Sequence, residues 1–407
     1  MATALVLNKI LAVYVGPMGY ASIGQFQNAM AIAIAFASGA INSGVTKVTA
    51  ENFDNEMRQR SLWRTAGTLT LCASAFLALF IMLFRESLAK FFLNNEALSG
   101  VFGWLAVSLV FISLNALLLS ILNGKKDVGR YVISNIMGSF LGLAVVGLLT
   151  WQYEVYGALV ALSVYQAVTF FATLGLCLKT NWFKIGDLFG KIDLKHGRTL
   201  AKFAFMALTT SIVAPLSQLF VRTHIGERFG WAHAGYWDAA WRISTIYLTF
   251  VTTTLSLYWL PRIAEIRSWA ELRREILATY KIVLPFAVLA ALIIYLMRDY
   301  IVLILFTPEF YPMRSLFSWQ MAGDVMKLGS WVLAFIMVGK GMTIEFVLTE
   351  TLAAVIFSLL TLLFTEYFGF RAVAMAHFYT YLVYWILVYT VTISTPDRRQ
   401  RLFRSVS

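Results

Sequence analysis

The sequence predicts an all-α polytopic membrane protein, with about twelve transmembrane helices arranged as two six-helix lobes. The chain has 407 residues, of which 59% are hydrophobic and 13% charged, whereas a soluble domain has about 25% charged residues. Its mean hydropathy is +0.73. Apolar runs long enough to cross a bilayer recur along the chain, and its two halves share weak sequence motifs.

Six apolar runs, each bounded by charged or turn residues, predict the helices of the first half. They cover residues 2–15, 20–45, 62–84, 101–122, 131–151 and 157–178. As a helix the first run would extend about 21 Å, which is less than the roughly 30 Å of a bilayer core. We therefore expect the first helix to be truncated or shorter than its neighbours.

Six further runs predict the helices of the second half. They cover residues 201–224, 235–259, 281–297, 315–338, 343–365 and 371–393. Pro215 falls in the middle of the first of them, where it would remove a backbone hydrogen bond and bend the helix. Pro215 is therefore a candidate hinge between inward-open and outward-open states, and a static kink is the alternative.

The distribution of positive charge predicts the orientation of the chain in the membrane. If the N-terminus is cytoplasmic, most of the 33 Lys and Arg residues fall on the cytoplasmic side, including those between residues 179 and 202. The positive-inside rule therefore places both termini in the cytoplasm. The formal net charge of +12 is then explained by topology and contact with membrane lipids, so no nucleic-acid partner is implied.

The two halves resemble each other weakly. Gly16 aligns with Gly230, and the Gly-Lys pair at 124–125 aligns with that at 339–340. Six spans in each half make the repeat parallel, which places a substrate site between the halves. We expect an N-terminal lobe at 1–180, a cytoplasmic linker at 181–200, a C-terminal lobe at 201–393 and a basic cytoplasmic tail at 394–407.

Charged residues lie inside several of the predicted spans. Placing one at the bilayer centre costs roughly 2.5–3.5 kcal/mol on insertion scales unless it is paired or faces water, so such residues indicate a polar pathway. We expect a substrate-binding set made of Arg222, Lys327, Asp324, Arg242, Asp238 and Lys9. Lys9 is included because residues 8–9 align with residues 222–223 of the other half.

Local pairing is the alternative explanation for two of these groups. Asp324 and Lys327 are three residues apart and share a helix face, so they can form an ion pair or line one cavity. Asp238 and Arg242, at i and i+4, can likewise neutralise each other. Asp324 and Glu350 are the candidates for binding a coupling ion, which is H⁺ or Na⁺.

Several classes of protein are excluded or disfavoured. The chain has no GxxxxGK[ST] motif, so it does not bind a nucleotide through a P-loop. Its four histidines lack metal-ligand spacing, and its two cysteines lie in apolar runs. We therefore expect a transporter with no cofactor and no bound metal, rather than an enzyme.

The chain resembles the Wzx-type flippases, in the polysaccharide-transporter branch of the multidrug/oligosaccharidyl-lipid/polysaccharide exporter superfamily. The residues that carry the resemblance are KILAVYVGPMGYASIGQFQN, GAINSGVTKVTAE, KFAFMALTTSI and LFSWQMAGDVMKLGSWVLAFIMVGKG. It extends over nearly the whole chain and includes the flippases of O-antigen and of enterobacterial common antigen (lipid III).

This resemblance implies a function. The substrate would be an undecaprenyl-pyrophosphate-linked oligosaccharide, moved by alternating access from the cytoplasmic to the periplasmic leaflet of the bacterial inner membrane. The polysaccharide polymerase complex is a candidate partner.

Two other functions stay open. A cation-coupled multidrug exporter of the same superfamily should have a cavity dominated by acids and aromatic residues, whereas this sequence places basic residues on four predicted helices. A non-transporting scaffold of the polysaccharide assembly complex would use the buried charges for helix pairing alone.

Overall fold

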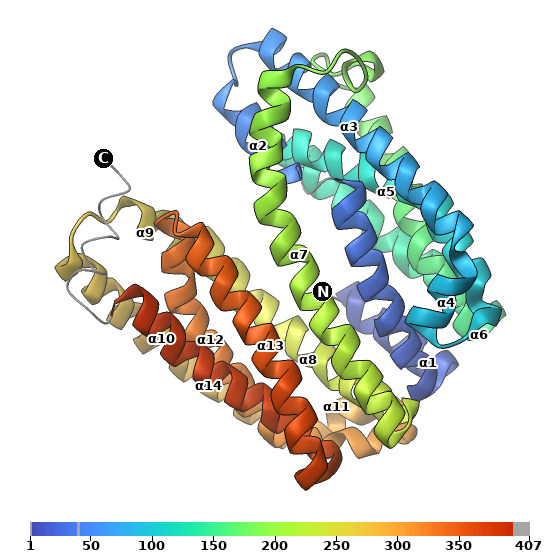
Figure 1. Ribbon diagram of the computed structural model, residues 1–407, viewed down its shortest axis with the longest axis vertical. Coiled ribbons are helices and arrows are strands. Elements are labelled where there is room, and N and C mark those ends of the chain that lie inside the picture. Colours follow the sequence, from blue (N-terminus) through green and yellow to red (C-terminus); the bar gives the residue numbers. More distant parts are fainter. Residues whose placement is uncertain (1, 39–40, 394–407) are drawn as a thin grey trace. The chain divides into compact units, whose positions relative to one another are not determined.

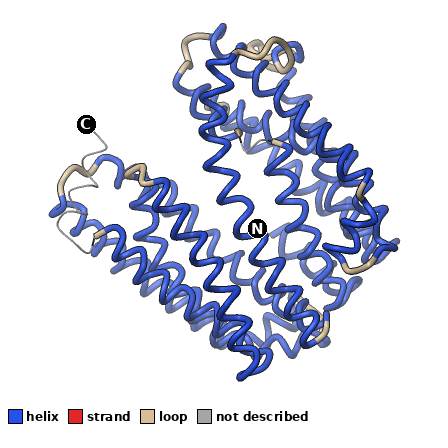
Figure 2. The backbone as a smooth tube through the Cα atoms, viewed as in Figure 1, coloured by secondary structure: helices blue, strands red, loops and turns tan. Residues whose placement is uncertain are grey.

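The computed structural model describes residues 2–38 and 41–393 (Figure 1). Within this part of the chain all regular structure is helical, and Figure 2 shows helices joined by short loops. The predicted all-α fold is therefore confirmed. The contacts within the chain divide it into two compact units, Met1–Leu219 and Phe220–Ser407, and the division falls inside one long helix, α7 (Leu194–Phe229).

Unit 1 holds α1 (Ala2–Ala37), α2 (Asn42–Glu51), α3 (Glu56–Leu83), α4 (Arg85–Leu93), α5 (Ser99–Gly124), α6 (Val128–Leu178) and most of α7. Two short 3₁₀ segments, Glu96–Leu98 and Ile185–Asp187, join these helices. Helix α5 packs against α3, α6 and α2, because its leucine-rich faces bury side chains on several sides. The core of the unit includes Trp63, Leu118 and Ile121.

Two of the long helices in unit 1 are broken at the predicted boundaries between spans. Helix α1 is interrupted at Gly16, whose φ of 64° lies in the left-handed region that glycine adopts most easily. Helix α6 is interrupted at Tyr153 and Glu154, within the predicted turn between residues 151 and 157. Each of these long helices therefore contains two predicted spans.

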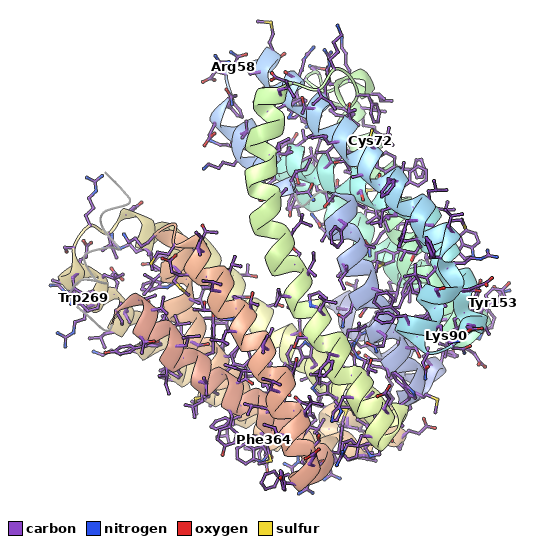
Figure 3. All side chains as sticks on the ribbon, in the orientation of Figure 1. Arg58, Cys72, Lys90, Tyr153, Trp269 and Phe364 are labelled. Carbon is purple, nitrogen blue, oxygen red and sulfur yellow. The ribbon has the colours of Figure 1, made fainter. Side chains whose placement is uncertain are left out.

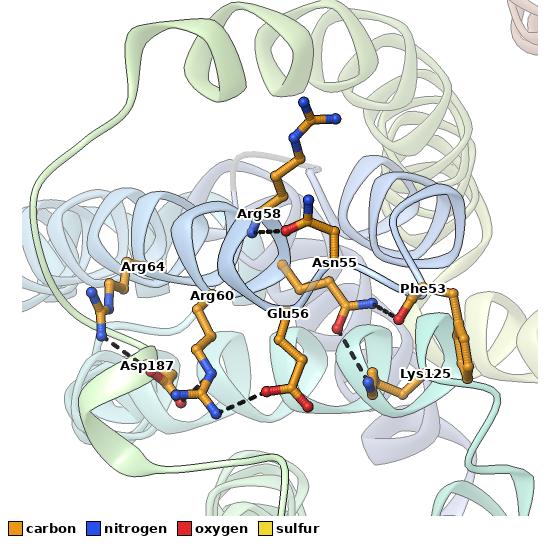
Figure 4. Close-up of polar contacts among 9 residues, drawn as sticks. Phe53, Asn55, Glu56, Arg58, Arg60, Arg64, Lys125 and Asp187 are labelled. Atoms are coloured by element: carbon orange, nitrogen blue, oxygen red, sulfur yellow. Dashed lines mark hydrogen bonds and ion pairs between the residues drawn. The ribbon is translucent and has the colours of Figure 1, made fainter.

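The end of the second span differs from the prediction. Its helix ends at Ala37 and a separate helix, α2, begins at Asn42, whereas the apolar run predicts one helix over 20–45. The reason is that α2 is polar, with the sequence NSGVTKVTAE, and does not continue the apolar run. Helix α3 begins at Glu56, six residues before the predicted 62, because the Asn55 side chain accepts a hydrogen bond from the Arg58 backbone N–H (Figure 4).

Residues of the predicted linker 181–200 are bound to α3. Asp187 is buried and lies 3.2 Å from Arg64 and 3.8 Å from Arg60 (Figure 4). The backbone approaches so closely that a Cβ at Gly67 would lie 1.9 Å from the carbonyl oxygen of Leu188. This part of the linker is therefore an integral part of unit 1.

Unit 2 contains the end of α7 and the helices that follow it. These are α8 (Trp231–Thr254), α9 (Leu260–Glu265), α10 (Trp269–Leu296), α11 (Arg298–Leu305), α12 (Phe317–Gly339), α13 (Thr343–Phe368) and α14 (Ala372–Thr392). A π-helical turn, Leu255–Trp259, joins α8 to α9, and 3₁₀ segments cover Pro308–Leu316 and Gly369–Arg371. Helix α12 packs against α14, α10, α8 and α9.

Two glycines let α14 approach α12 closely. A Cβ at Gly323 would lie 2.4 Å from the His377 ring, and one at Gly329 would lie 2.3 Å from the Trp385 ring. Figure 1 shows α10, α12, α13 and α14 running side by side. The close approach brings the polar side chains of α14 against those of α12.

Seven helical segments in the described part of the chain are long and apolar enough to cross a membrane. Three of them, Thr3–Ala37, Val128–Leu178 and Thr343–Thr392, each contain two predicted spans, so together the seven account for ten of the twelve. The remaining two predictions, 201–224 and 235–259, fall on the helices α7 and α8. Asp238 and Arg242 make α8 less apolar than the other predicted spans. The chain is therefore a multi-pass membrane protein.

Candidate functional site

Three charged side chains from two helices of unit 2, two of them buried and one half-buried, form a charged triad. Nη2 of Arg222 on α7 donates to Oδ1 of Asp238 on α8 at 2.5 Å, and Nε of Arg242 donates to Oδ2 at 2.8 Å. Arg222 and Asp238 are 2% and 3% exposed. Two guanidinium groups thus share one carboxylate, and the triad keeps one excess positive charge.

The triad contains the predicted i, i+4 pair of Asp238 and Arg242, and also a contact that the sequence pattern does not show. Arg222 belongs to another helix and lies over the Trp237 ring at 5.4 Å. Because no acid lies within a turn of Arg222 on its own helix, local spacing could not reveal its contact with Asp238.

Asp324, in the first half of α12, is fully buried and binds side chains from two other helices. Its Oδ1 lies 2.9 Å from Nε2 of His377 on α14, and its Oδ2 accepts a hydrogen bond from the Tyr247 hydroxyl on α8 at 2.7 Å. Among the described residues Asp324 forms no ion pair with Lys327. The alternative that these two residues neutralise each other is therefore not the arrangement in this structure.

The Lys327 ammonium instead lies in an aromatic cage. Its Nζ is 4.9 Å from the ring centroids of Trp241 on α8 and Trp331 on α12, and 5.0 Å from that of Tyr381 on α14. The negative ring faces attract the cation, by roughly 2 kcal/mol for a desolvated contact. Lys327 is therefore buried, and within the described part of the chain no carboxylate is bound to it.

Glu350, on α13, accepts a hydrogen bond from the Tyr384 hydroxyl at 2.5 Å. It also lines a cavity of about 270 Å³, together with Trp331 of the cage and Thr252. The three residues of α14 that contact the site, His377, Tyr381 and Tyr384, follow one helix face, with neighbouring ring centroids 4.9 and 6.0 Å apart. This face connects the buried Asp324 with the half-buried Glu350.

The sequence patterns missed the neutral partners of the charged residues. These are Tyr247, Trp241, Trp331, Tyr381 and Tyr384, together with His377. The spacing of residues 377, 381 and 384 is the one local signal, because it places them on one side of a helix. Their role becomes visible only once α8, α12 and α14 are packed together.

Two predicted site residues belong to unit 1. Lys9 is half-buried on the first segment of α1, beside Asn8, which accepts a hydrogen bond from Tyr20 at 3.1 Å. Pro215 lies inside α7 and lines a cavity of about 600 Å³ with Ser211, Ala31 and Asn42. Their assignment to substrate binding and to a hinge stays a prediction. Within residues 2–38 and 41–393, no group of three His, Cys, Asp or Glu residues has the geometry to hold a metal ion.

Comparison with known proteins identifies the family. Two curated relatives, the lipid III flippases of Escherichia coli (strain K12) and Shigella flexneri, are each 28% identical to this chain over 389 residues. The aligned region covers 95% of this chain and 93% of each relative. Both are named as transporters.

Solved structures show the same fold. A multidrug resistance MATE family transporter of the MOP superfamily, in its inward-facing conformation, superposes with a TM-score of 0.81 at 16% identity. That superposition covers 99% of this chain and 95% of the transporter. The lipid II flippase MurJ, in an inward closed conformation, gives 0.76 at 14% identity over 99% and 88%. The polysaccharide biosynthesis protein family matches residues 24–315, and this chain therefore belongs to that family.

Proposed function

We propose that this protein is a flippase that moves a lipid-linked oligosaccharide across the membrane for surface polysaccharide assembly. The substrate is carried on undecaprenyl pyrophosphate and passes from the cytoplasmic to the periplasmic leaflet of the bacterial inner membrane. The main support is the 28% identity to lipid III flippases along nearly the full length of both chains. The fold, which drug transporters and lipid flippases share, does not by itself choose between these substrates.

The observation that carries the proposal is buried positive charge in unit 2. The triad has one charge in excess, and Lys327 is held by aromatic rings with no carboxylate bound to it. A pyrophosphate group needs cations where water is scarce, and an Arg side chain offers a planar fork that matches phosphate oxygens. In this scheme Lys327 leaves its cage to bind the substrate, and the aromatic faces then become available to the sugars.

We propose that transport is coupled to H⁺ through Asp324 and His377. The two oxygens of Asp324 are occupied by Tyr247 and His377, whereas a hard metal cation requires several oxygen ligands. Nδ1 of His377 has no hydrogen-bond partner among the described residues, so the ring has a nitrogen at which a second proton can bind. Glu350 is the alternative coupling residue.

We further propose that α7 bends at Pro215 during alternating access. The residue lies four positions before the boundary between the two units, and proline removes one backbone hydrogen bond from the helix. In this proposal both termini lie in the cytoplasm, which is the orientation that the distribution of Lys and Arg predicts. Lys9 would add a cation from unit 1.

Reconstitution tests the function directly. The purified protein would be placed in vesicles with a fluorescent undecaprenyl-pyrophosphate oligosaccharide, and transfer to the other leaflet measured by loss of accessibility to an external quencher. We expect protein-dependent transfer that an imposed pH gradient accelerates and a Na⁺ gradient does not. Lys327→Met should abolish transfer, whereas Arg274→Gln, a matched loss of an exposed cation, should not.

The same vesicles distinguish the alternatives. Uptake of a cationic dye without transfer of the lipid would identify a multidrug exporter. Absence of both activities in a correctly folded protein, as judged by its thermal unfolding, would favour the scaffold.

A further inference from the structure

A cavity of about 420 Å³ lies in unit 2, apart from the buried charges described above. It is formed by α10, α12 and α14, and its lining includes Trp269, Arg273, Tyr280, Leu333, Trp385 and Tyr389. Trp269, which is labelled in Figure 3, is the first residue of α10. Ile393, which directly follows the last residue of α14, also lines the cavity. The predicted topology places these two residues on the cytoplasmic side.

The inner wall of the cavity is preformed. The Tyr280 hydroxyl donates to the backbone carbonyl of Gly329 at 2.9 Å, and Nε1 of Trp385 donates to the Tyr280 oxygen at 3.1 Å. The rings of Tyr280 and Trp385 are 5.8 Å apart, and Trp385 packs directly against Gly329. These contacts satisfy the polar atoms of the two aromatic residues and leave their apolar faces to form the wall.

Arg273 supplies a cation at the cavity. Its side chain is exposed and has no ion pair or hydrogen bond within the described part of the chain. The acids two positions away on either side, Glu271 and Glu275, are bound instead by Arg262, at 3.2 and 3.0 Å. These contacts raise the pKa of Arg262, first through the hydrogen bond that it donates to Glu275. The charge of Arg273 thus remains available to a ligand.

The lining has the character of a membrane–water interface. Trp and Tyr concentrate where headgroups meet the acyl chains, and a guanidinium at that depth attracts anionic lipid. Leu277, half exposed, and buried Leu333 add an apolar surface beside the charged residue. An amphiphile with one anionic group at the water side therefore matches the cavity in both charge and polarity.

We propose that this cavity binds an anionic phospholipid of the cytoplasmic leaflet, with its phosphate on Arg273 and its upper acyl chain against the aromatic and leucine wall. One guanidinium matches the single negative charge of a phosphodiester, whereas the pyrophosphate of a polyprenyl carrier has more charge than Arg273 alone neutralises. The site is independent of the proposed transport activity, and it would make the protein sensitive to lipid composition.

Lipid binding to the purified full-length protein tests the proposal. Native mass spectrometry would count phosphatidylglycerol molecules that stay bound after delipidation and readdition, with phosphatidylethanolamine as the zwitterionic comparison. We expect Arg273→Gln to weaken phosphatidylglycerol binding about fivefold to tenfold and to leave phosphatidylethanolamine unchanged. The control is Arg274→Gln. Arg274 follows Arg273 in the sequence and is also exposed, but it does not line the cavity.

Several results would overturn the proposal. Equal loss in Arg273→Gln and Arg274→Gln would mean a general charge effect, and preferred binding of undecaprenyl pyrophosphate would identify a substrate site. If Arg273→Gln fails to fold, Leu277→Glu provides a second test, because an added negative charge beside the cavity should also repel the lipid.

Discussion

Nε2 of His377 on α14 lies 2.9 Å from Oδ1 of Asp324 on α12, so this buried carboxylate binds an imidazole from another helix. Lys327, one turn away on the same helix as Asp324, is turned toward three aromatic rings instead. Asp324 and Lys327, the charged residues of α12, therefore have separate partners. This separation leads to predictions that differ from those of a simple ion pair.

Removing both charges of α12 should not restore what removing one destroys. In a buried ion pair, loss of one partner typically costs about 3–5 kcal/mol and loss of both can be nearly neutral. Here Asp324 and Lys327 bind different groups. The double variant Asp324→Asn/Lys327→Gln should therefore be no more stable to unfolding than the less stable of the two single variants. Thermal unfolding midpoints of the three variants in one detergent check this. Recovery of the midpoint in the double variant would show that the two residues do pair.

Loss of the positive charge of Lys327 should impair transport more than it impairs folding. Lys327→Met keeps a flexible apolar chain whose sulfur packs well against aromatic rings, so the protein should remain folded. Transfer of the labelled lipid should nevertheless fall to background, because the cation is gone. Lys327→Arg is the matched control, and should retain part of the activity. Normal transfer by Lys327→Met would remove Lys327 from the substrate site.

The triad should depend more on Asp238 than on either arginine. Asp238→Asn leaves the buried Arg222 and the half-buried Arg242 without their carboxylate, which should lower the unfolding midpoint markedly. Adding Arg222→Gln to that variant leaves a net charge of one positive unit, equal to that of the native triad, and should restore much of the midpoint. Transport should stay lost in the double variant if the position of Arg222 matters. Restored transport would instead indicate that only the net charge is required.

Gly67 should be essential for the position of the linker. A Cβ there would lie 1.9 Å from the carbonyl oxygen of Leu188, so Gly67→Ala should displace the linker and break the contact between Asp187 and Arg64. We expect faster trypsin cleavage after the exposed Lys184 and Lys191.

The matched control for this prediction is Gly175→Ala on α6, where nothing lies within 4 Å of the added Cβ. Because alanine favours helix by about 1 kcal/mol over glycine, this variant should be as resistant to trypsin as the native protein. Equal cleavage of both alanine variants would mean that the linker does not depend on close contact with Gly67.

The sequence by itself determined the membrane-spanning fold. Apolar runs of suitable length are a local property, and they located ten of the spans as well as the breaks at Gly16 and near Glu154. They also identified the unusual charges, because a charge inside an apolar run is visible without knowledge of its neighbours. The predicted bounds were wrong at residues 42–45, where the polar residues of α2 gave too weak a signal to end the apolar run.

Only the tertiary structure decided which groups those charges bind. The partners of Asp324 come from α8 and α14, those of Lys327 from α8, α12 and α14, and the carboxylate for Arg222 comes from α8. Helical spacing predicts neighbours three or four residues away, but it does not predict which helices cross or how closely. In this protein Gly323 and Gly329 allow α14 to lie close to α12. Asp324 therefore binds side chains of neighbouring helices in place of Lys327, which is one turn away on its own helix.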